Sequence, residues 1–212
     1  MEFAEFLSIV PKITKETLPA TDAHLIMAPP ERADVIRNID KATYNPREAA
    51  VLMLFYPRNE QTNLALILRN SYNGVHSSQV AFPGGKVETF DKSLCQAALR
   101  ETHEEIGIAP SIINVVRAFT ELFIPPSNFI VHPFLGFSNE ELIFDPDPSE
   151  VAGLIEFPVT DFLSDKTVVQ NRMATAYSDS VVVPTFKIGD HFVWGATAMI
   201  MSEVKEVMKK LL

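Results

Sequence analysis

Residues 93–106 constrain the fold more than any other part of the chain, because a helix start, a helix stop and an apolar helical period coincide there. Ser93 followed by Gln96 makes a capping box, with Asp91 as a rival N-cap, and Gly107 suits the position just after a helix. An amphipathic helix is stable mainly through burial of its apolar face. The chain must therefore provide a surface for this helix to cover.

Short apolar runs bounded by polar, Gly or Pro residues predict the strands of that surface. The first two, residues 50–56 and 64–68, are expected to form a hairpin around residues 57–63. The other expected strands are residues 79–83, which end in Gly84-Gly85, and residues 112–122, 129–137, 151–157, 181–188 and 191–194. Residues 158–163 are expected to form a helical turn and residues 196–211 a terminal helix. The predicted fold class is α+β, a mixed sheet with a few helices packed on it.

The first 48 residues differ in character from the rest, and a domain boundary is expected between an arm, 1–48, and a domain, 49–212. Residues 1–17 carry apolar side chains at helical spacing, which predicts an amphipathic helix. Residues 18–47 contain four prolines and no sustained period, so we expect an arm with one helical turn near residues 31–39. This helix and arm are the expected contact elements of a homodimer.

Composition and charge narrow the functional classes. With 212 residues, 47% of them hydrophobic and 21% charged, the chain can bury a large core by itself. The formal net charge of −9 argues against a nucleic-acid partner bound through a broad basic face. A small phosphorylated ligand is compatible with this charge, because it needs only a local cluster of Arg and Lys.

Cysteine usage and the lack of long apolar runs predict the compartment. Cys95 is the only cysteine, so no intrachain disulfide can form and a reduced, cytoplasmic setting is expected. The N-terminal residues lack the basic segment of a secretory signal, and no apolar run is long enough to span a bilayer. Cys95 also falls on the apolar stripe of the helix, so a catalytic thiol is not expected there.

The same helix concentrates acidic side chains. Its apolar stripe consists of Cys95, Leu99, Thr102 and Ile106. A second stripe beside it consists of Leu94, Ala97, Glu101, Glu104 and Glu105. Like charges at this spacing cost about 0.2–0.5 kcal/mol on an isolated helix, and the dipole at its C-terminal end disfavours anions further. Hard divalent cations such as Mg²⁺ would offset this cost, with Arg100 holding a carboxylate in place; the alternative is a solvated acidic face with one Arg counterion.

Residues 83–86, Pro-Gly-Gly-Lys, lead from the expected strand toward this helix. Two glycines permit a close backbone approach and dihedral angles that other residues avoid. A Gly-Gly pair alone indicates only a turn. Coupled to a helix with three clustered glutamates, it becomes a specific functional signal.

Residues 85–91 and 100–108 resemble the two halves of the Nudix box, the motif of Nudix hydrolases. The second half matches at every fixed position except Thr102, where an aliphatic residue is usual. The first half is one residue longer than usual, and with this insertion Gly85 takes the glycine position and Asp91 the acidic position. The longer first half resembles the coenzyme A pyrophosphatase branch of the family.

Other segments are similar to the same branch. They are residues 66–71, His76 and residues 79–85 upstream of the helix, and residues 148–151 and 193–198 downstream. Gly74 stands where the branch usually has Arg, and Ser78 where it usually has Gly. The missing Arg bears on direct recognition of a coenzyme A phosphate.

The resemblance implies a Nudix-type α/β/α sandwich that hydrolyses a diphosphate with the help of Mg²⁺ or Mn²⁺. It implies that Glu101 and Glu105 are primary metal ligands and that Glu104 is a further ligand, direct or through water. Arg100 is implied as the residue that orients these carboxylates. Glu104, Glu105 and Arg100 are thus the implied catalytic residues of the helix, joined by Glu150 from a later loop.

The general base is left open between two acids. Glu150 precedes an apolar strand at a position similar to the branch, Glu121 ends a strand, and each is equally explained as a surface acid. The candidate substrate-binding residues are Arg69, His76, Gly84, Gly85 and Lys86. Trp194 and Phe192 are expected in the core rather than as platforms for a base.

Three functions remain in competition. The first is cleavage of coenzyme A or acyl-coenzyme A to 3′,5′-ADP and (acyl)phosphopantetheine. The second keeps the chemistry but acts on ADP-ribose, a dinucleotide or a nucleoside triphosphate. The third is a catalytically silent nucleotide-binding module, and the intact Glu101, Glu104 and Glu105 argue against it.

Overall fold

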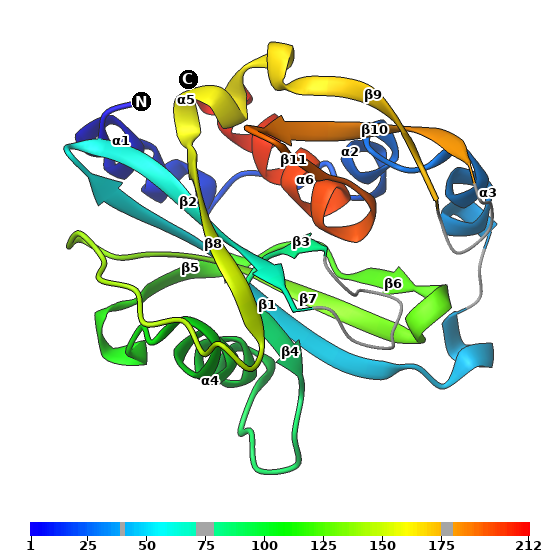
Figure 1. Cartoon of the computed structure of the whole chain (residues 1–212), viewed down its shortest axis with the longest axis horizontal. Helices are drawn as coiled ribbons and strands as arrows, with labels where there is room; N and C mark the ends of the chain where they lie inside the picture. The colour runs from blue at the N-terminus through cyan, green and yellow to red at the C-terminus, as the bar shows by residue number, and fades with distance from the viewer. Residues whose placement is uncertain (39–40, 71–78, 175–179) are drawn as a thin grey trace.

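The computed structural model describes residues 1–38, 41–70, 79–174 and 180–212. In this part of the chain, a large mixed sheet lies between two layers of helices (Figure 1). One layer is α4 (Leu94–Ile106), and the other contains α1 (Phe3–Ile13), α2 (Thr21–Ile26) and α6 (Gly195–Leu211). The predicted α/β/α sandwich is therefore confirmed.

The sheet is built around β1 (Arg47–Arg58), which pairs antiparallel with β2 (Gln61–Arg69) and parallel with β7 (Phe129–Phe137). Its other strands are β3 (Val80–Ala81), β4 (Gly84–Lys86), β5 (Asn114–Ala118), β6 (Leu122–Ile124) and β8 (Val151–Pro158). The predicted β1–β2 hairpin forms, but its turn is shorter than predicted, because strand pairing continues to Arg58 and Gln61. β5 and β6 replace the single strand predicted at 112–122, because the N–H of Thr120 between them donates to Glu203 at 3.0 Å.

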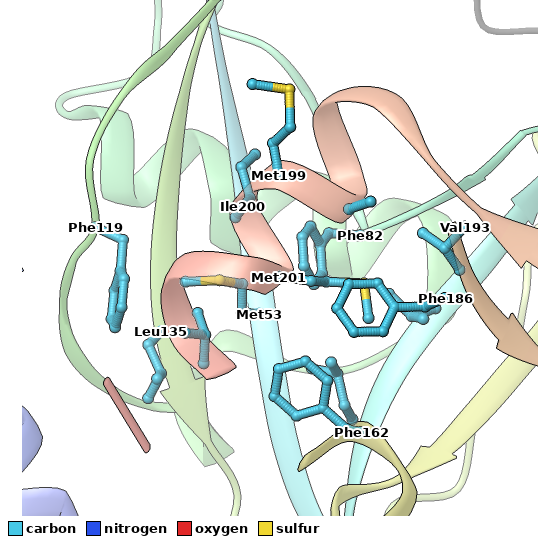
Figure 2. Close-up of a cluster of buried hydrophobic side chains, with 14 of the residues drawn as sticks. Met53, Phe82, Phe119, Leu135, Phe162, Phe186, Val193, Met199, Ile200 and Met201 are labelled. Carbon is cyan, nitrogen blue, oxygen red and sulfur yellow. The ribbon is translucent and has the colours of Figure 1, made fainter. Parts of the chain in front are cut away.

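The two faces of β1 enter two different cores. Leu52 and Leu54 pack with α4 in one cluster, whereas Met53 and Phe55 pack toward α6 in the other. Figure 2 shows part of the second cluster, where Met53 lies among aromatic and methionine side chains. The alternation follows from the period of two residues along a strand. It places α4 and α6 on opposite faces of the same strand.

The N-terminal region is more helical than its sequence suggests. In the segment predicted as an arm with one helical turn, the structure has α2, α3 (Pro30–Asn38) and a 3-10 turn at Lys41–Tyr44. Proline is tolerated at a first helical position, so Pro30 begins α3 rather than preventing it. α1 forms as predicted and stacks Phe6 on Phe55 with ring centroids 5.1 Å apart. Buried Glu203 of α6 accepts the Ala20 N–H at 2.9 Å and fixes the start of α2.

A second, antiparallel sheet lies beside α6 (Figure 1). It contains β9 (Val168–Met173), β10 (Val181–Ile188) and β11 (His191–Val193). β10 and β11 match predicted strands, whereas the half-exposed residues of β9 show no clear alternation of apolar and polar side chains. Along the chain, α5 (Val159–Leu163) follows β8 at the predicted helical turn, and further 3-10 turns lie at Pro110–Ile112, Pro125–Ser127 and Asp165–Thr167. None of the helices in the described part of the chain has both the length and the apolar character needed to span a bilayer.

Candidate active site

Both predicted caps hold α4 in place. The hydroxyl of Ser93 accepts the Gln96 N–H at 3.1 Å, and the Gln96 side chain accepts the Lys92 N–H at 2.8 Å. Gly107 ends the helix in the left-handed region at φ +75°. An added Cβ there would lie 2.8 Å from that of Asp145, so Gly107 also allows a close approach. The prediction for residues 93–106 is confirmed.

The buried face of α4 is rotated from the predicted one. It consists of Ala97, Ala98, Thr102, Glu105 and Ile106. Cys95 is only half-buried, so its assignment to the core stripe is wrong. Thr102 is fully buried, and its hydroxyl donates to the carbonyl of Ala98 at 2.7 Å, which satisfies a polar group at a usually aliphatic position. The rotation brings Glu105, 1% exposed, inside the interface with the sheet.

Glu105 is held by groups from two strands. Its Oε2 accepts the Gly84 N–H at 2.7 Å, and its Oε1 lies 3.3 Å from Nη1 of Arg69 without hydrogen-bond geometry. Burial raises the pKa of Glu105 to about 7, although the Arg69 charge and the Gly84 N–H oppose the rise. The side chain is thus a desolvated carboxyl, and none of the described residues donates a hydrogen bond to its buried Oε1.

Gly84 and Gly85 form a strand, not the predicted turn. They belong to β4, which pairs antiparallel with β1, an alignment that sequence spacing cannot show. Gly84 has φ +147°, and a Cβ there would lie 2.4 Å from the Ala50 carbonyl oxygen. A Cβ on Gly85 would lie 2.3 Å from Oε2 of Glu101. One glycine therefore allows the backbone path, and the other leaves room for a carboxylate.

Arg100 ties the remaining acids together. Its Nε and Nη2 donate to the two oxygens of Asp91 at 3.0 and 2.9 Å, and its Nη1 donates to Glu101 and Glu104 at 2.7 Å each. The guanidinium lowers the pKa of Asp91, whose side chain is 1% exposed. Asp91 is thus an anchor for Arg100 and not the helix N-cap. These contacts give Arg100 the orienting geometry that the resemblance implies.

The carboxylates suit a hard divalent cation by their chemistry. Among the described residues, no group of three or more His, Cys, Asp or Glu side chains is already arranged to hold a metal ion. Glu101 and Glu104 instead point toward Arg100, which donates a hydrogen bond to each of them. Yet the buried Oε1 of Glu105 accepts no hydrogen bond from the part of the chain that the structure describes, and oxygen ligands are those that Mg²⁺ prefers. The residues present therefore fit a divalent cation, which would take the place of Arg100 as the partner of Glu101 and Glu104.

The other predicted site residues lie at different places relative to α4. Arg69 lies beside Glu105, whereas the Lys86 side chain is exposed and pairs with Glu88 at 3.1 Å. His76 lies outside the described residues. The exposed Glu150 is close enough to contribute to raising the pKa of Glu101 and Glu105.

The rival candidate base, Glu121, lies beside a histidine. Its Oε2 is 3.8 Å from His132 Nδ1, and Glu48 is 3.6 Å from the other ring nitrogen of that histidine. The charge of Glu150 contributes to raising the pKa of both Glu101 and Glu105. This effect on the two carboxylates of α4 supports Glu150 as a candidate base.

A cavity of about 580 Å³ opens beside β4. Arg69, Gly84, Gly85 and Lys86, all predicted substrate-binding residues, line it. Its wall also includes Ala49 and Val51, whose neighbours Ala50 and Leu52 face α4, so the cavity lies on the opposite face of β1. The glycine strand therefore borders both the cavity and the glutamates of α4.

Two cavity residues were not predicted. Trp194 lines the cavity and is half-buried, which corrects its expected place in the core. Arg32 of α3 lines it as well, is 6% exposed and donates to the Phe123 carbonyl at 2.7 Å. Both lie far from the box in sequence; Trp194 stands within the branch-like segment 193–198, whereas no local motif marks Arg32.

Known proteins with similar sequences identify the family of this chain. The family described as NUDIX domain matches residues 46–177, which include α4, β4 and Arg69. The chain belongs to the Nudix family. It is 35% identical over 168 residues to an uncharacterized Nudix hydrolase NudL of Enterobacter sp. (strain 638), covering 76% of this chain and 82% of that protein. It is 34% identical over 175 residues to Nudix hydrolase 22, chloroplastic, of Arabidopsis thaliana, covering 78% and 56% respectively.

Solved structures support the same fold. A Nudix hydrolase from M. Smegmatis, RenU, superposes with a TM-score of 0.54 at 18% identity, covering 79% of this chain and 88% of that one. A MutT/nudix family protein from Enterococcus faecalis gives 0.53 at 17% identity, covering 99% and 70%. Family membership and the carboxylate helix make this protein a Nudix diphosphate hydrolase, an enzyme class that uses divalent metal ions.

Proposed function

We propose that this Nudix hydrolase cleaves the diphosphate of coenzyme A or acyl-coenzyme A to 3′,5′-ADP and (acyl)phosphopantetheine. The observation that carries the proposal is the position of the branch-like segments 66–71 and 79–85. They place Arg69, Gly84 and Gly85 at the cavity wall and in contact with the carboxylates of α4. Apolar residues such as Phe82, Ile124 and Phe129 also line the cavity, which suits a substrate with apolar parts.

The chain's own residues have distinct roles in this proposal. Glu101, Glu104 and Glu105 would hold Mg²⁺ or Mn²⁺, which supplies Lewis-acid stabilisation of phosphate oxygens and a lower pKa for bound water. Arg100 orients Glu101 and Glu104 through hydrogen bonds of 2.7 Å. The Gly84 N–H holds Glu105 toward the glycine strand.

The remaining roles fall to residues at the mouth of the site. Arg69 lies between Glu105 and the cavity, where it binds a phosphate oxygen of the substrate. Glu150 accepts the proton of the attacking water, whose oxygen bonds to phosphorus as the bridging P–O bond breaks. Its exposure leaves it accessible to water, and its charge acts on both Glu101 and Glu105.

The test is a substrate panel assayed with Mg²⁺ or Mn²⁺. Coenzyme A and acetyl-coenzyme A are compared with ADP-ribose, a diadenosine polyphosphate and nucleoside triphosphates. We expect the coenzyme A compounds to have the highest kcat/KM and Glu105→Gln to lose at least roughly a hundredfold. Glu5→Gln, an exposed carboxylate of α1, is the matched control.

Each other outcome has a definite meaning. Preference for ADP-ribose, a dinucleotide or a triphosphate would replace the substrate but keep the chemistry. No turnover on any compound would favour a silent nucleotide-binding module. Turnover that survives Glu105→Gln would refute the assignment of the metal ligands.

A further inference from the structure

The cavity beside β4 has a mainly apolar wall. None of its described lining residues is acidic, and its large apolar side chains come from the main sheet, from the residue after β11 and from α6. They are Phe82, Ile124, Phe129, Val131, Trp194 and Ile200. Its volume of about 580 Å³ is within the range of sites that hold small molecules. The wall therefore points to a ligand with a large apolar part.

The cationic side chains of the wall already have partners within the protein. Arg69 lies 3.3 Å from the carboxylate of Glu105. Lys86 pairs with Glu88 at 3.1 Å, and Arg32 donates to a backbone carbonyl of β6 at 2.7 Å. These groups therefore do not require an anionic ligand inside the cavity. The surface that the cavity offers beyond them is chiefly apolar.

The apolar wall belongs to the core between the sheet and α6. Phe82, Ile124, Val131 and Ile200 are members of the same buried cluster. Figure 2 shows part of this cluster, including Phe82 and Ile200. The cavity is thus an opening in the apolar core and not a polar cleft. A ligand rich in methylene groups would remove this surface from water, which is favourable in proportion to the area covered.

The same cavity is continuous with the candidate active site. Arg69, Gly84 and Gly85 line it, and the Gly84 N–H donates to the catalytic carboxylate Glu105 at 2.7 Å. A Cβ on Gly85 would meet the carboxylate of Glu101. One substrate can therefore place its diphosphate at the carboxylates of α4 and a group attached to the diphosphate in the cavity.

The apolar wall is built partly by segments outside the family match. That match covers residues 46–177, whereas Pro29 lies before it and Trp194, Ala196 and Ile200 lie after it. The carboxylate helix and the glycine strand lie inside the match. The chemistry thus depends on the shared part of the chain, and the shape of the cavity depends also on the flanking parts. This division is expected of a surface that selects among substrates.

We propose that the cavity binds the acyl chain of an acyl-coenzyme A, so that the enzyme prefers acylated coenzyme A to the free thiol. The inference rests on the proposed function and deepens it, because it selects one substrate class. The 3′,5′-ADP portion of such a substrate is charged, and the pantetheine arm carries amide groups. The hydrocarbon of the acyl chain is the part that matches an apolar wall.

The first test compares turnover of coenzyme A with that of its acetyl, hexanoyl and octanoyl thioesters in the presence of Mg²⁺. Full burial of one methylene group corresponds to about a fourfold gain in affinity. We expect kcat/KM to rise roughly tenfold or more from acetyl- to hexanoyl-coenzyme A, mainly through a lower KM. A series that is flat or falls with chain length would overturn the acyl assignment.

The second test measures binding without turnover. Trp194 lines the cavity and is the only tryptophan of the chain, so its fluorescence reports on occupancy. The full-length protein with Mg²⁺ is titrated with three products of the proposed reaction: hexanoyl-4′-phosphopantetheine, 4′-phosphopantetheine and 3′,5′-ADP. We expect the hexanoyl compound to bind roughly tenfold or more tightly than its unacylated form. A fluorescence change with 3′,5′-ADP alone would contradict the proposal.

A variant that fills the cavity separates acyl binding from a general loss of structure. Ala196, half-buried in the first turn of α6, lines the cavity. In calorimetry, Ala196→Phe should weaken hexanoyl-4′-phosphopantetheine roughly tenfold or more and leave 4′-phosphopantetheine unchanged. Ala4→Phe, at an exposed position of α1, should change neither affinity. If Ala196→Phe unfolds in a thermal melt, Ala196→Leu should give a smaller effect in the same direction. Equal effects on both ligands would refute an acyl site at this wall.

The outcomes distinguish this inference from the proposed function. Binding of the hexanoyl compound without cleavage of any coenzyme A substrate would keep the acyl site and refute the proposed reaction. Cleavage of coenzyme A compounds with a kcat/KM that is independent of chain length, in the wild type and in Ala196→Phe, would keep the reaction and refute the acyl site.

Discussion

Glu105→Gln should stabilise the metal-free protein at alkaline pH, although it should abolish activity. Glutamine keeps an oxygen that can accept the Gly84 N–H, which now lies 2.7 Å from Oε2, but it carries no charge to bury. Burial raises the pKa of Glu105 from an ordinary 4.5 to about 7. In the unfolded chain the carboxyl ionises near its ordinary pKa, whereas the folded protein keeps the proton until near pH 7.

The sign and size of the effect follow from these two pKa values. The stability contributed by protonated Glu105 is fully present below pH 4.5 and is lost as the pH rises to about 7. At about 1.4 kcal/mol per pH unit, the loss reaches about 3 kcal/mol. Glutamine does not titrate, so the difference in unfolding free energy between variant and wild type should shift by about that amount from pH 4.5 to 8.

Urea denaturation with a chelator, at several pH values in this range, measures the difference directly. Glu5→Gln on the exposed face of α1 is the control, whose curve should stay parallel to that of the wild type. Adding Mn²⁺ at 100 times its Kd should stabilise the wild type at pH 8 by about 2.7 kcal/mol and Glu105→Gln far less. Parallel pH dependence in the wild type and Glu105→Gln would refute the reasoning, because it would mean that Glu105 ionises freely in the folded state.

Three further changes test the frame of the site. Gly84→Ala should cost several kcal/mol in urea denaturation, because its Cβ would lie 2.4 Å from a backbone oxygen, whereas Gly153→Ala, with open space around it, should cost less than about 1 kcal/mol. Asp91→Asn should flatten the loss of stability below about pH 4, because Arg100 lowers the pKa of Asp91 and that stabilisation disappears as the carboxylate is protonated. Glu203→Ala should destabilise the fold by about 3 kcal/mol and expose the start of α2 to limited proteolysis, since it removes a buried acceptor of backbone N–H groups; intact digestion kinetics would contradict this.

The elements with strong local signals could be predicted from the sequence. α4 has both caps and an apolar period within its own residues, and β7 and β10 form at the predicted bounds. α2 depends instead on Glu203, far away in the chain, so residues 18–47 could not show it. β4 depends on pairing with β1, and a Gly-Gly pair reads as a turn until that partner is known. The elements that were not predicted are therefore those stabilised by contacts with distant residues.

The residues of the site show the same difference between local signals and distant contacts. Arg100, Glu101, Glu104 and Glu105 are neighbours on one helix, so their grouping follows from helical geometry. The ion pair of Arg69 with Glu105 depends on where β2 lies relative to α4; the family resemblance marked segment 66–71 but not this contact. The cavity residues Arg32 and Trp194 are far apart in the chain, and only the folded structure shows that both line the same cavity.

Glu105 shows which part of the site a helical wheel can predict and which part it cannot. The wheel placed Glu105 beside the apolar stripe, whereas the structure places it within the buried face, where a hydrocarbon side chain would be more stable. The sheet offers the Gly84 N–H and the Arg69 charge at 3.3 Å, and these do not restore an ordinary pKa. The same desolvation that destabilises the metal-free fold strengthens the attraction of the ionised carboxylate for a divalent cation. The position is therefore best explained by the cation it would hold and not by the packing of α4.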